Sequence, residues 1–174
     1  TYAFAFQIFC DFSGYTDIAR GAARVMGFEL MLNFRQPYLS ESIREFWSRW
    51  HISLSSWFRD YLYIPLGGNR ASKFGWYRNL FITFLVSGLW HGANWTFVIW
   101  GALHGLYLVA GLVLEPLRKQ VLEATGLERT PFLLGTLRKL FTFHLVLLGW
   151  IFFRANTAGD ALKAIRKMAE VPSD

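Results

Sequence analysis

Residues 79–114 read NLFITFLVSGLWHGANWTFVIWGALHGLYLVAGLVL, a stretch of 36 residues without Asp, Glu, Lys or Arg. One helix that crosses a bilayer core of about 30 Å needs about 20 residues, so this stretch is too long for one crossing and fits two segments. Gly92-Ala93-Asn94 marks the break, because Gly and Asn weaken a helix. The sequence therefore predicts a broken or re-entrant helical pair at 79–90 and 95–114.

The composition of the chain also favours a membrane protein. Of its 174 residues, 53% are hydrophobic and 17% are charged, whereas about 25% of the residues of a soluble protein are charged. The net charge of +6 and the 18% of aromatic residues would suit nucleic-acid binding if the aromatic rings were exposed. They lie inside long apolar runs, so we expect no nucleic-acid partner and instead contact between basic residues and anionic lipid headgroups.

Two more apolar segments and one amphipathic helix complete the predicted fold. The apolar segments lie at 1–12, where Ser13-Gly14 breaks the pattern, and at 134–153. Ser42 and Glu45 have the spacing of a capping box, which begins a helix over 41–58. That helix carries aromatic residues on one face and mixed charges on the other, which is typical of the membrane interface.

The predicted fold class is therefore an all-α, polytopic membrane protein with an interfacial helix. The chain begins at Thr1 inside an apolar stretch and ends in a charged helical pattern at 160–170. We expect residues 1–174 to form a single, partial membrane domain of a longer protein.

Histidines are the best candidates for chemistry, because polar side chains at membrane depth are costly and are often functional. His91 stands at the predicted helix break, where a neutral imidazole could act as a general base. Its alternative role is a buried histidine that bonds a carbonyl group. His51 ends the amphipathic pattern and either lines a pocket or lies at the headgroup level. His104 and His144 lie in mid-helix without a neighbouring acid, which favours a packing role.

Other catalytic and metal-binding patterns are missing from the sequence. No two histidines lie four residues apart, and the single Cys10 excludes a disulfide or a cysteine-rich metal site. The sequence holds no Gly-x-Ser-x-Gly elbow and no P-loop. We therefore expect no bound metal and no nucleotide-binding motif.

Three long motifs carry a family resemblance. They are FWSRWHISLS at 46–55 with RDYLYIPLGG at 59–68, GLWHGANW at 88–95, and DFSGYTDIA at 11–19. Together they resemble the membrane-bound O-acyltransferase family, and most closely its bacterial alginate O-acetyltransferase-like subgroup. That subgroup is related to the transferases that act on peptidoglycan and to the D-alanyl transferases of teichoic acid.

The resemblance implies a multi-pass enzyme of the bacterial cytoplasmic membrane, whose spans enclose a tunnel. The acyl group, an acetyl group in this subgroup, would pass to hydroxyls of an extracytoplasmic polysaccharide such as alginate. The two family histidines fall on His91, as general base, and on His51, as its partner. Trp90, Asn94 and Trp95 would shape the substrate pocket together with Trp50.

The resemblance also implies the partners of the reaction. The acyl donor is a co-substrate such as acetyl-CoA or an acyl carrier, with no bound cofactor. Membrane lipids, an envelope polysaccharide and extracytoplasmic acyltransferase proteins are the expected partners. Two alternatives stay open: transfer of D-alanyl or another acyl group to a different envelope polymer, and a non-enzymatic membrane scaffold or transporter-like component.

Overall fold

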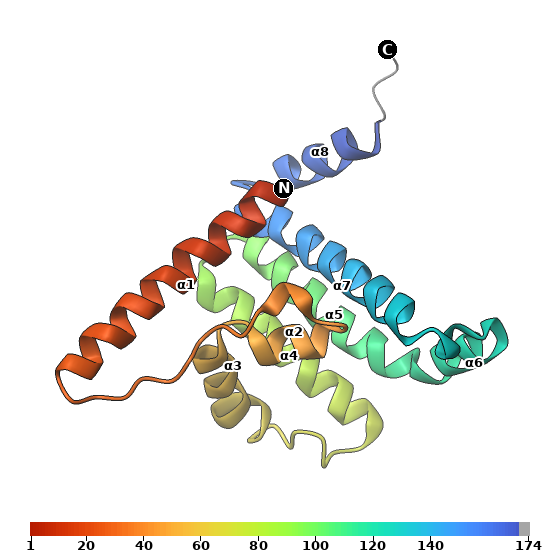
Figure 1. The fold of residues 1–174 in the computed structure, drawn as a ribbon, viewed down its shortest axis with the longest axis horizontal. Coiled ribbons are helices and arrows are strands. Elements are labelled where there is room, and N and C mark those ends of the chain that lie inside the picture. Colours follow the sequence, from red (N-terminus) through yellow and green to blue (C-terminus); the bar gives the residue numbers. More distant parts are fainter. Residues whose placement is uncertain (171–174) are drawn as a thin grey trace.

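The computed structural model describes residues 1–170, and this part of the chain is helical without a β-strand (Figure 1). The elements in chain order are α1 (Tyr2–Val25), η1 (Pro37–Leu39), α2 (Ile43–Arg49), α3 (Ile52–Phe58), η2 (Arg59–Tyr63), α4 (Lys73–His91), α5 (Trp95–Val113), α6 (Glu115–Thr125), η3 (Leu127–Arg129), α7 (Pro131–Arg154) and α8 (Ala158–Ala169). The all-helical prediction is therefore confirmed for the described residues.

Helices α4 and α5 form a tight hairpin with the most extensive helix–helix contact of the fold. The chain turns at Gly92–Asn94, as the sequence predicts, and the side chain of Asn94 caps α5 by accepting from the Thr96 backbone N–H at 3.1 Å. Gly88 faces Gly101 so closely that a Cβ atom on either one would overlap a backbone carbonyl of the opposite helix. Small residues allow such a close approach of two backbones, which is the usual way helices pack in a membrane.

A cluster of large aromatic side chains joins this hairpin to α2 and α7. Phe46, Trp100 and Trp150 are each about 1% exposed. The Trp150 indole donates to the Tyr38 hydroxyl at 3.2 Å, and that hydroxyl donates to the Ala5 carbonyl oxygen at 2.6 Å. The core therefore lies where α2, α5 and α7 meet, and Tyr38 attaches the first part of α1 to it.

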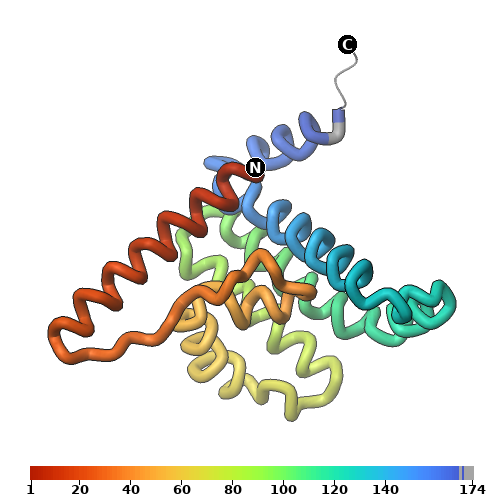
Figure 2. The backbone as a smooth tube through the Cα atoms, viewed as in Figure 1, coloured from red at the N-terminus to blue at the C-terminus, as the bar shows by residue number. Residues whose placement is uncertain are grey.

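Helix α1 is twice as long as the sequence indicates. The predicted end at Ser13-Gly14 is wrong, since the helix continues to Val25. The Thr16 hydroxyl donates to the Ser13 carbonyl within the helix at 2.9 Å. One glycine costs only about 1 kcal/mol in a helix, which the flanking helical residues offset. The outer half of α1 projects away from the other helices, and residues 26–36 run back to the centre of the molecule (Figure 2).

The helix predicted over 41–58 is also wrong in its extent, because it divides into α2 and α3 at Trp50-His51. His51 has a left-handed backbone with φ 46°, which no continuous helix allows. Asn33 holds the break in place: its carbonyl accepts from the Ile52 N–H at 3.1 Å and its side chain from the Ser53 N–H at 2.9 Å. These long-range contacts, absent from any local pattern, decide where the helix divides.

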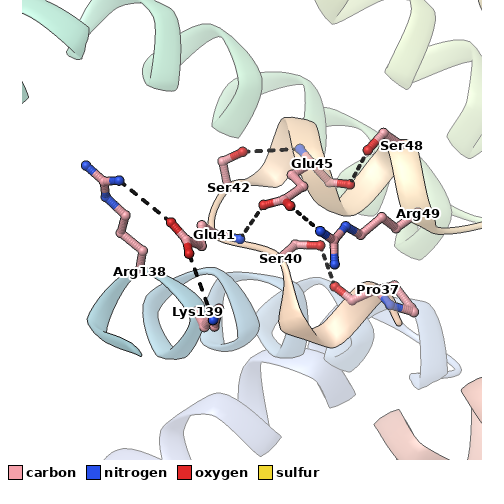
Figure 3. Close-up of polar contacts among 9 residues, drawn as sticks. All are labelled: Pro37, Ser40, Glu41, Ser42, Glu45, Ser48, Arg49, Arg138 and Lys139. Carbon is pink, nitrogen blue, oxygen red and sulfur yellow. Dashed lines mark hydrogen bonds and ion pairs between the residues drawn. The ribbon is translucent and has the colours of Figure 1, made fainter. Parts of the chain in front are cut away.

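The start of α2 contains the predicted capping box in a modified form (Figure 3). The Ser42 hydroxyl accepts from the Glu45 N–H at 3.1 Å, while the Glu45 carboxylate accepts from the Glu41 N–H at 2.7 Å. The Glu41 carboxylate lies 3.7 Å from Arg138 and 3.9 Å from Lys139 on α7. This end of α2 is therefore fixed both to its own first turn and to α7.

Two helices of the described residues are long and apolar enough to cross a membrane, namely Trp95–Val113 (α5) and Pro131–Arg154 (α7). They contain the segment predicted at 134–153 and all but the last residue of the segment predicted at 95–114. The segments predicted at 1–12 and 79–90 lie in α1 and α4, which do not meet the same criterion. Helix α1 carries Asp11, Asp17 and Arg20, and α4 begins with Lys73 and Arg78, so both are more polar than the isolated segments.

Candidate functional site

The fold brings His51 and His91 to one open hollow of about 600 Å³, although forty residues separate them in the sequence. His51 comes from the break between α2 and α3, and His91 is the last residue of α4. The rest of the hollow is lined by Phe4, Gln7, Ile8, Asp11, Phe12, Tyr15, Trp90 and Phe153. A ligand bound in this hollow could therefore contact both histidines.

The His91 ring is held by aromatic packing. The rings of Trp90, Trp100 and Phe153 lie edge-on to it, with centroids 5.0–5.1 Å away. Within residues 1–170, no group hydrogen-bonds the imidazole of His91. The orientation of the ring is thus fixed by packing, while its nitrogen atoms stay available to a ligand.

The His51 ring packs edge-on against Phe12, with centroids 4.7 Å apart. Its Nδ1 atom is buried and has no hydrogen-bond partner among the described residues. Burial lowers the pKa of His51 below its ordinary value of 6.5, because desolvation disfavours the charged ring. A neutral imidazole can donate to or accept from a bound substrate through its other nitrogen, Nε2.

The other predicted site residues lie in different places. Trp90 lines the hollow and is 57% exposed. Trp50 is buried in the core, 4% exposed, with its ring 5.0 Å from that of Trp150. Asn94 caps α5 and donates to the Asn156 carbonyl oxygen at 3.0 Å, and Trp95 is 75% exposed. Of the four predicted pocket residues, only Trp90 lies beside the two histidines.

The remaining histidines lie outside the hollow. His104 is fully buried in mid-helix, and its Nδ1 accepts from the Trp47 indole at 3.2 Å. His144 is exposed, with its two ring nitrogens 2.8 Å from the Tyr2 hydroxyl and 2.7 Å from the Leu140 carbonyl oxygen. Each has a contact that explains its presence in the fold.

Sequence reasoning missed the wall of the hollow that α1 provides. Gln7, Asp11 and Tyr15 recur every four residues, as do Phe4, Ile8 and Phe12 in a parallel row; all six line the hollow. Residues four apart share a helix face. Five of the six residues lie within the predicted segment 1–12, and only Tyr15 lies beyond the expected break at Ser13-Gly14. The segment was interpreted only as an apolar span, so its polar row was not recognised.

A second cavity of about 550 Å³ lies on the other side of α2 and α3. Arg44 and Arg59 line it together with Ser48, Ser55 and apolar residues of α4 and α5. Its lining residue Phe58 stands edge-on to Trp90 of the first hollow, with ring centroids 6.5 Å apart. The two spaces thus approach each other at this aromatic pair.

No group of three or more His, Cys, Asp or Glu side chains in the described part of the chain is arranged to hold a metal ion. The hollow contains the imidazoles of His51 and His91 and the carboxylate of Asp11. It also contains the phenol of Tyr15 and the indole of Trp90. Such a set suits proton transfer to and from a hydroxyl group.

The chain is similar to several curated proteins. The chain is 54% identical over 166 residues to "Probable alginate O-acetylase AlgI" of Pseudomonas aeruginosa, covering 95% of the chain and 30% of that protein. It is 43% identical over 167 residues to a peptidoglycan O-acetyltransferase of Helicobacter pylori, covering 95% and 30%. It is 32% identical over 160 residues to a teichoic acid D-alanyltransferase of Bacillus subtilis, covering 87% and 39%.

The chain spans about a third of the length of these curated relatives. The model of one family, described as MBOAT, membrane-bound O-acyltransferase family, matches residues 1–151, which contain both histidines of the hollow. A match over that much of the chain decides its classification: this chain belongs to the membrane-bound O-acyltransferase family.

Proposed function

We propose that the protein containing this chain transfers an acyl group, specifically acetyl, from a donor to hydroxyls of an extracytoplasmic polysaccharide such as alginate. The observation that carries the proposal is the convergence of His51 and His91 on one hollow with polar and aromatic walls. The names of the relatives, which describe acyl transfer to alginate, peptidoglycan and teichoic acid, support the reaction class.

In the proposed reaction, neutral His91 is the general base. It accepts the proton of the acceptor hydroxyl while the hydroxyl oxygen attacks the carbonyl carbon of an acyl thioester. The new C–O ester bond forms, the C–S bond breaks, and the leaving thiolate takes the proton back from His91. His51 assists by donating to the carbonyl oxygen or by orienting the hydroxyl. The rings around His91 exclude water and so limit hydrolysis of the donor.

We assign the acyl donor, acetyl-CoA or an acyl carrier, to the cavity on the other side of α2 and α3. Arg44 and Arg59 line that cavity, and guanidinium groups are well suited to bind phosphate oxygens. No Lys or Arg lines the histidine hollow in the described residues. The acyl group would reach the hollow past Phe58 and Trp90.

We place this domain, residues 1–174, in the bacterial cytoplasmic membrane as part of a multi-pass protein. Helices α5 and α7 have the length and hydropathy of spans. The α4–α5 hairpin would be re-entrant, and α2 and α3 would lie at the interface in place of one continuous amphipathic helix. Envelope polysaccharide, membrane lipids and extracytoplasmic acyltransferase proteins are the proposed partners.

The test uses the full-length protein in inner-membrane vesicles, with acetyl-CoA or acetylated acyl carrier as donor and O-deacetylated alginate as acceptor. His91→Ala should abolish ester formation, and His51→Ala should reduce it strongly, with membrane insertion unchanged. His144→Ala is the matched control, because this histidine lies outside the hollow. Transfer by His91→Ala at the wild-type rate would refute the proposal.

The second candidate is D-alanyl transfer to another envelope polymer, which the similarity to the teichoic acid D-alanyltransferase favours. Mass spectrometry of envelope polymers with and without the full-length gene separates the two. An acetyl ester that depends on the gene supports the first candidate, and a D-alanyl ester supports the second.

A further inference from the structure

Helix α1 presents two parallel rows of side chains to the histidine hollow. The apolar row is Phe4, Ile8 and Phe12, and the polar row is Gln7, Asp11 and Tyr15. With a rise of 1.5 Å per residue, each row extends over about 12 Å. That length is sufficient to contact more than one sugar ring of an extended polymer.

The polar row is free to bind a ligand. In residues 1–170, the side chains of Gln7, Asp11 and Tyr15 make no hydrogen bond or ion pair. Further along the same helix, Asp17 is paired with Arg20 at 3.4 Å. Asp11 is exposed, and its carboxylate is therefore free to accept hydrogen bonds from a ligand in the hollow.

The chemistry of the row identifies the class of ligand. A carboxylate accepts hydrogen bonds from up to two hydroxyl groups, and an amide and a phenol both donate and accept. The rings of Phe12, Tyr15 and Trp90 provide flat apolar faces next to these groups. Precisely spaced polar groups between aromatic faces suit a hydroxyl-rich ring compound such as a sugar.

The charge of the hollow separates this ligand from the acyl donor. Asp11 is the one carboxylate among its lining residues, and no Lys or Arg of the described chain lines it. A carboxylate repels the phosphate groups of coenzyme A or of a phosphopantetheine arm. The α1 side of the hollow thus disfavours phosphate groups, and it offers hydrogen-bond partners to the hydroxyl groups of an acceptor.

We propose that Gln7, Asp11 and Tyr15 form the acceptor-binding row of the site, with Asp11 accepting hydrogen bonds from sugar hydroxyls next to the one that His91 deprotonates. This inference rests on the proposed function and adds residues that determine acceptor binding. A hydrogen bond to a charged group contributes enough that its loss weakens binding about tenfold or more.

The test compares transfer with donor hydrolysis in the full-length protein in inner-membrane vesicles. Acetyl-CoA or acetylated acyl carrier is the donor, and O-deacetylated alginate or O-deacetylated peptidoglycan is the acceptor. We expect Asp11→Asn to raise the KM for the polymer about tenfold, and Gln7→Leu to raise it by a smaller factor. Hydrolysis of the donor without a polymer is the second measurement: a loss of acceptor binding lowers the rate of transfer more than the rate of hydrolysis, because hydrolysis involves no polymer.

Asp17→Asn is the matched control, since this carboxylate is on the same helix but outside the histidine hollow. An unchanged KM in Asp11→Asn overturns the inference and leaves the proposed function intact. A parallel loss of transfer and hydrolysis also overturns it, because that pattern indicates a structural role. Failure of the wild-type protein to acylate either polymer overturns both proposals.

Discussion

The substitution Gly88→Ala tests whether the close approach of α4 and α5 positions His91. A Cβ atom at residue 88 would lie 3.1 Å from the carbonyl carbon of Phe97 and 3.2 Å from the Cα atom of Gly101. Ordinary contact begins at about 3.4 Å, and every atom it meets belongs to the backbone. Since no rotamer change can relieve such contacts, the two helices have to move apart.

The expected cost is about 1–3 kcal/mol, the usual range for overpacking a tight interface. His91 lies one turn after Gly88 on α4, so a shift of the helix moves the imidazole relative to His51 on α3. A displacement of about 1 Å is enough to reduce catalysis roughly a hundredfold. Gly88→Ala should therefore lower both stability and acyl transfer.

The assay combines thermal unfolding of the full-length protein in detergent with acyl transfer in membrane vesicles. Gly111→Ala is the matched control, because a Cβ atom there meets nothing within 4 Å on α5. In a helix this control exchange is neutral or stabilises by about 0.5–1 kcal/mol. The reasoning is refuted if Gly88→Ala unfolds at the same temperature as Gly111→Ala and retains its activity.

Three further substitutions test other parts of the structure. Gly149→Ala would place a Cβ atom 2.7 Å from His104 Nε2. We therefore expect the free energy of unfolding to fall by about 1–3 kcal/mol. In a double-mutant unfolding cycle, His104→Ala should partly restore this stability. Asn79 is fully buried and donates to the carbonyls of Leu66 at 2.9 Å and Gly68 at 3.2 Å. Asn79→Ala should lower the free energy of unfolding by about 1–3 kcal/mol. It should also make the loop between η2 and α4, which contains Leu66 and Gly68, more sensitive to limited proteolysis than it is in the exposed control Asn69→Ala. Burial lowers the pKa of His51 in the folded protein. As the pH falls through about 6.5, the unfolded chain therefore protonates His51 before the folded protein does. The free energy of unfolding is thus unaffected by this group above that pH and decreases below it. The drop in unfolding temperature between about pH 7.5 and about pH 5 should be smaller in His51→Gln than in the wild type, and an equal drop in both would contradict the role of this ring.

The local sequence pattern was sufficient to predict the helices whose positions depend only on their own residues. The uncharged stretch 79–114, the break at Gly92–Asn94 and the long apolar segment ending at Arg154 all have their helices close to the predicted positions. Motifs around His51 and His91 also indicated the family before any geometry was known, and the family match agrees. These features depend on hydropathy, helix propensity and motif identity, which the chain carries residue by residue.

Tertiary structure decided what depends on contacts between distant residues. Asn33 divides the interfacial helix at His51 through bonds to residues 52 and 53, and no pattern in 41–58 contains that information. The extension of α1 through Gly14 placed Tyr15 in the hollow, and packing buried Trp50 in the core. By itself, the sequence determined which residues could do chemistry. Only the fold determined which of them share a space, because proximity arises from burial and backbone contacts made across the chain.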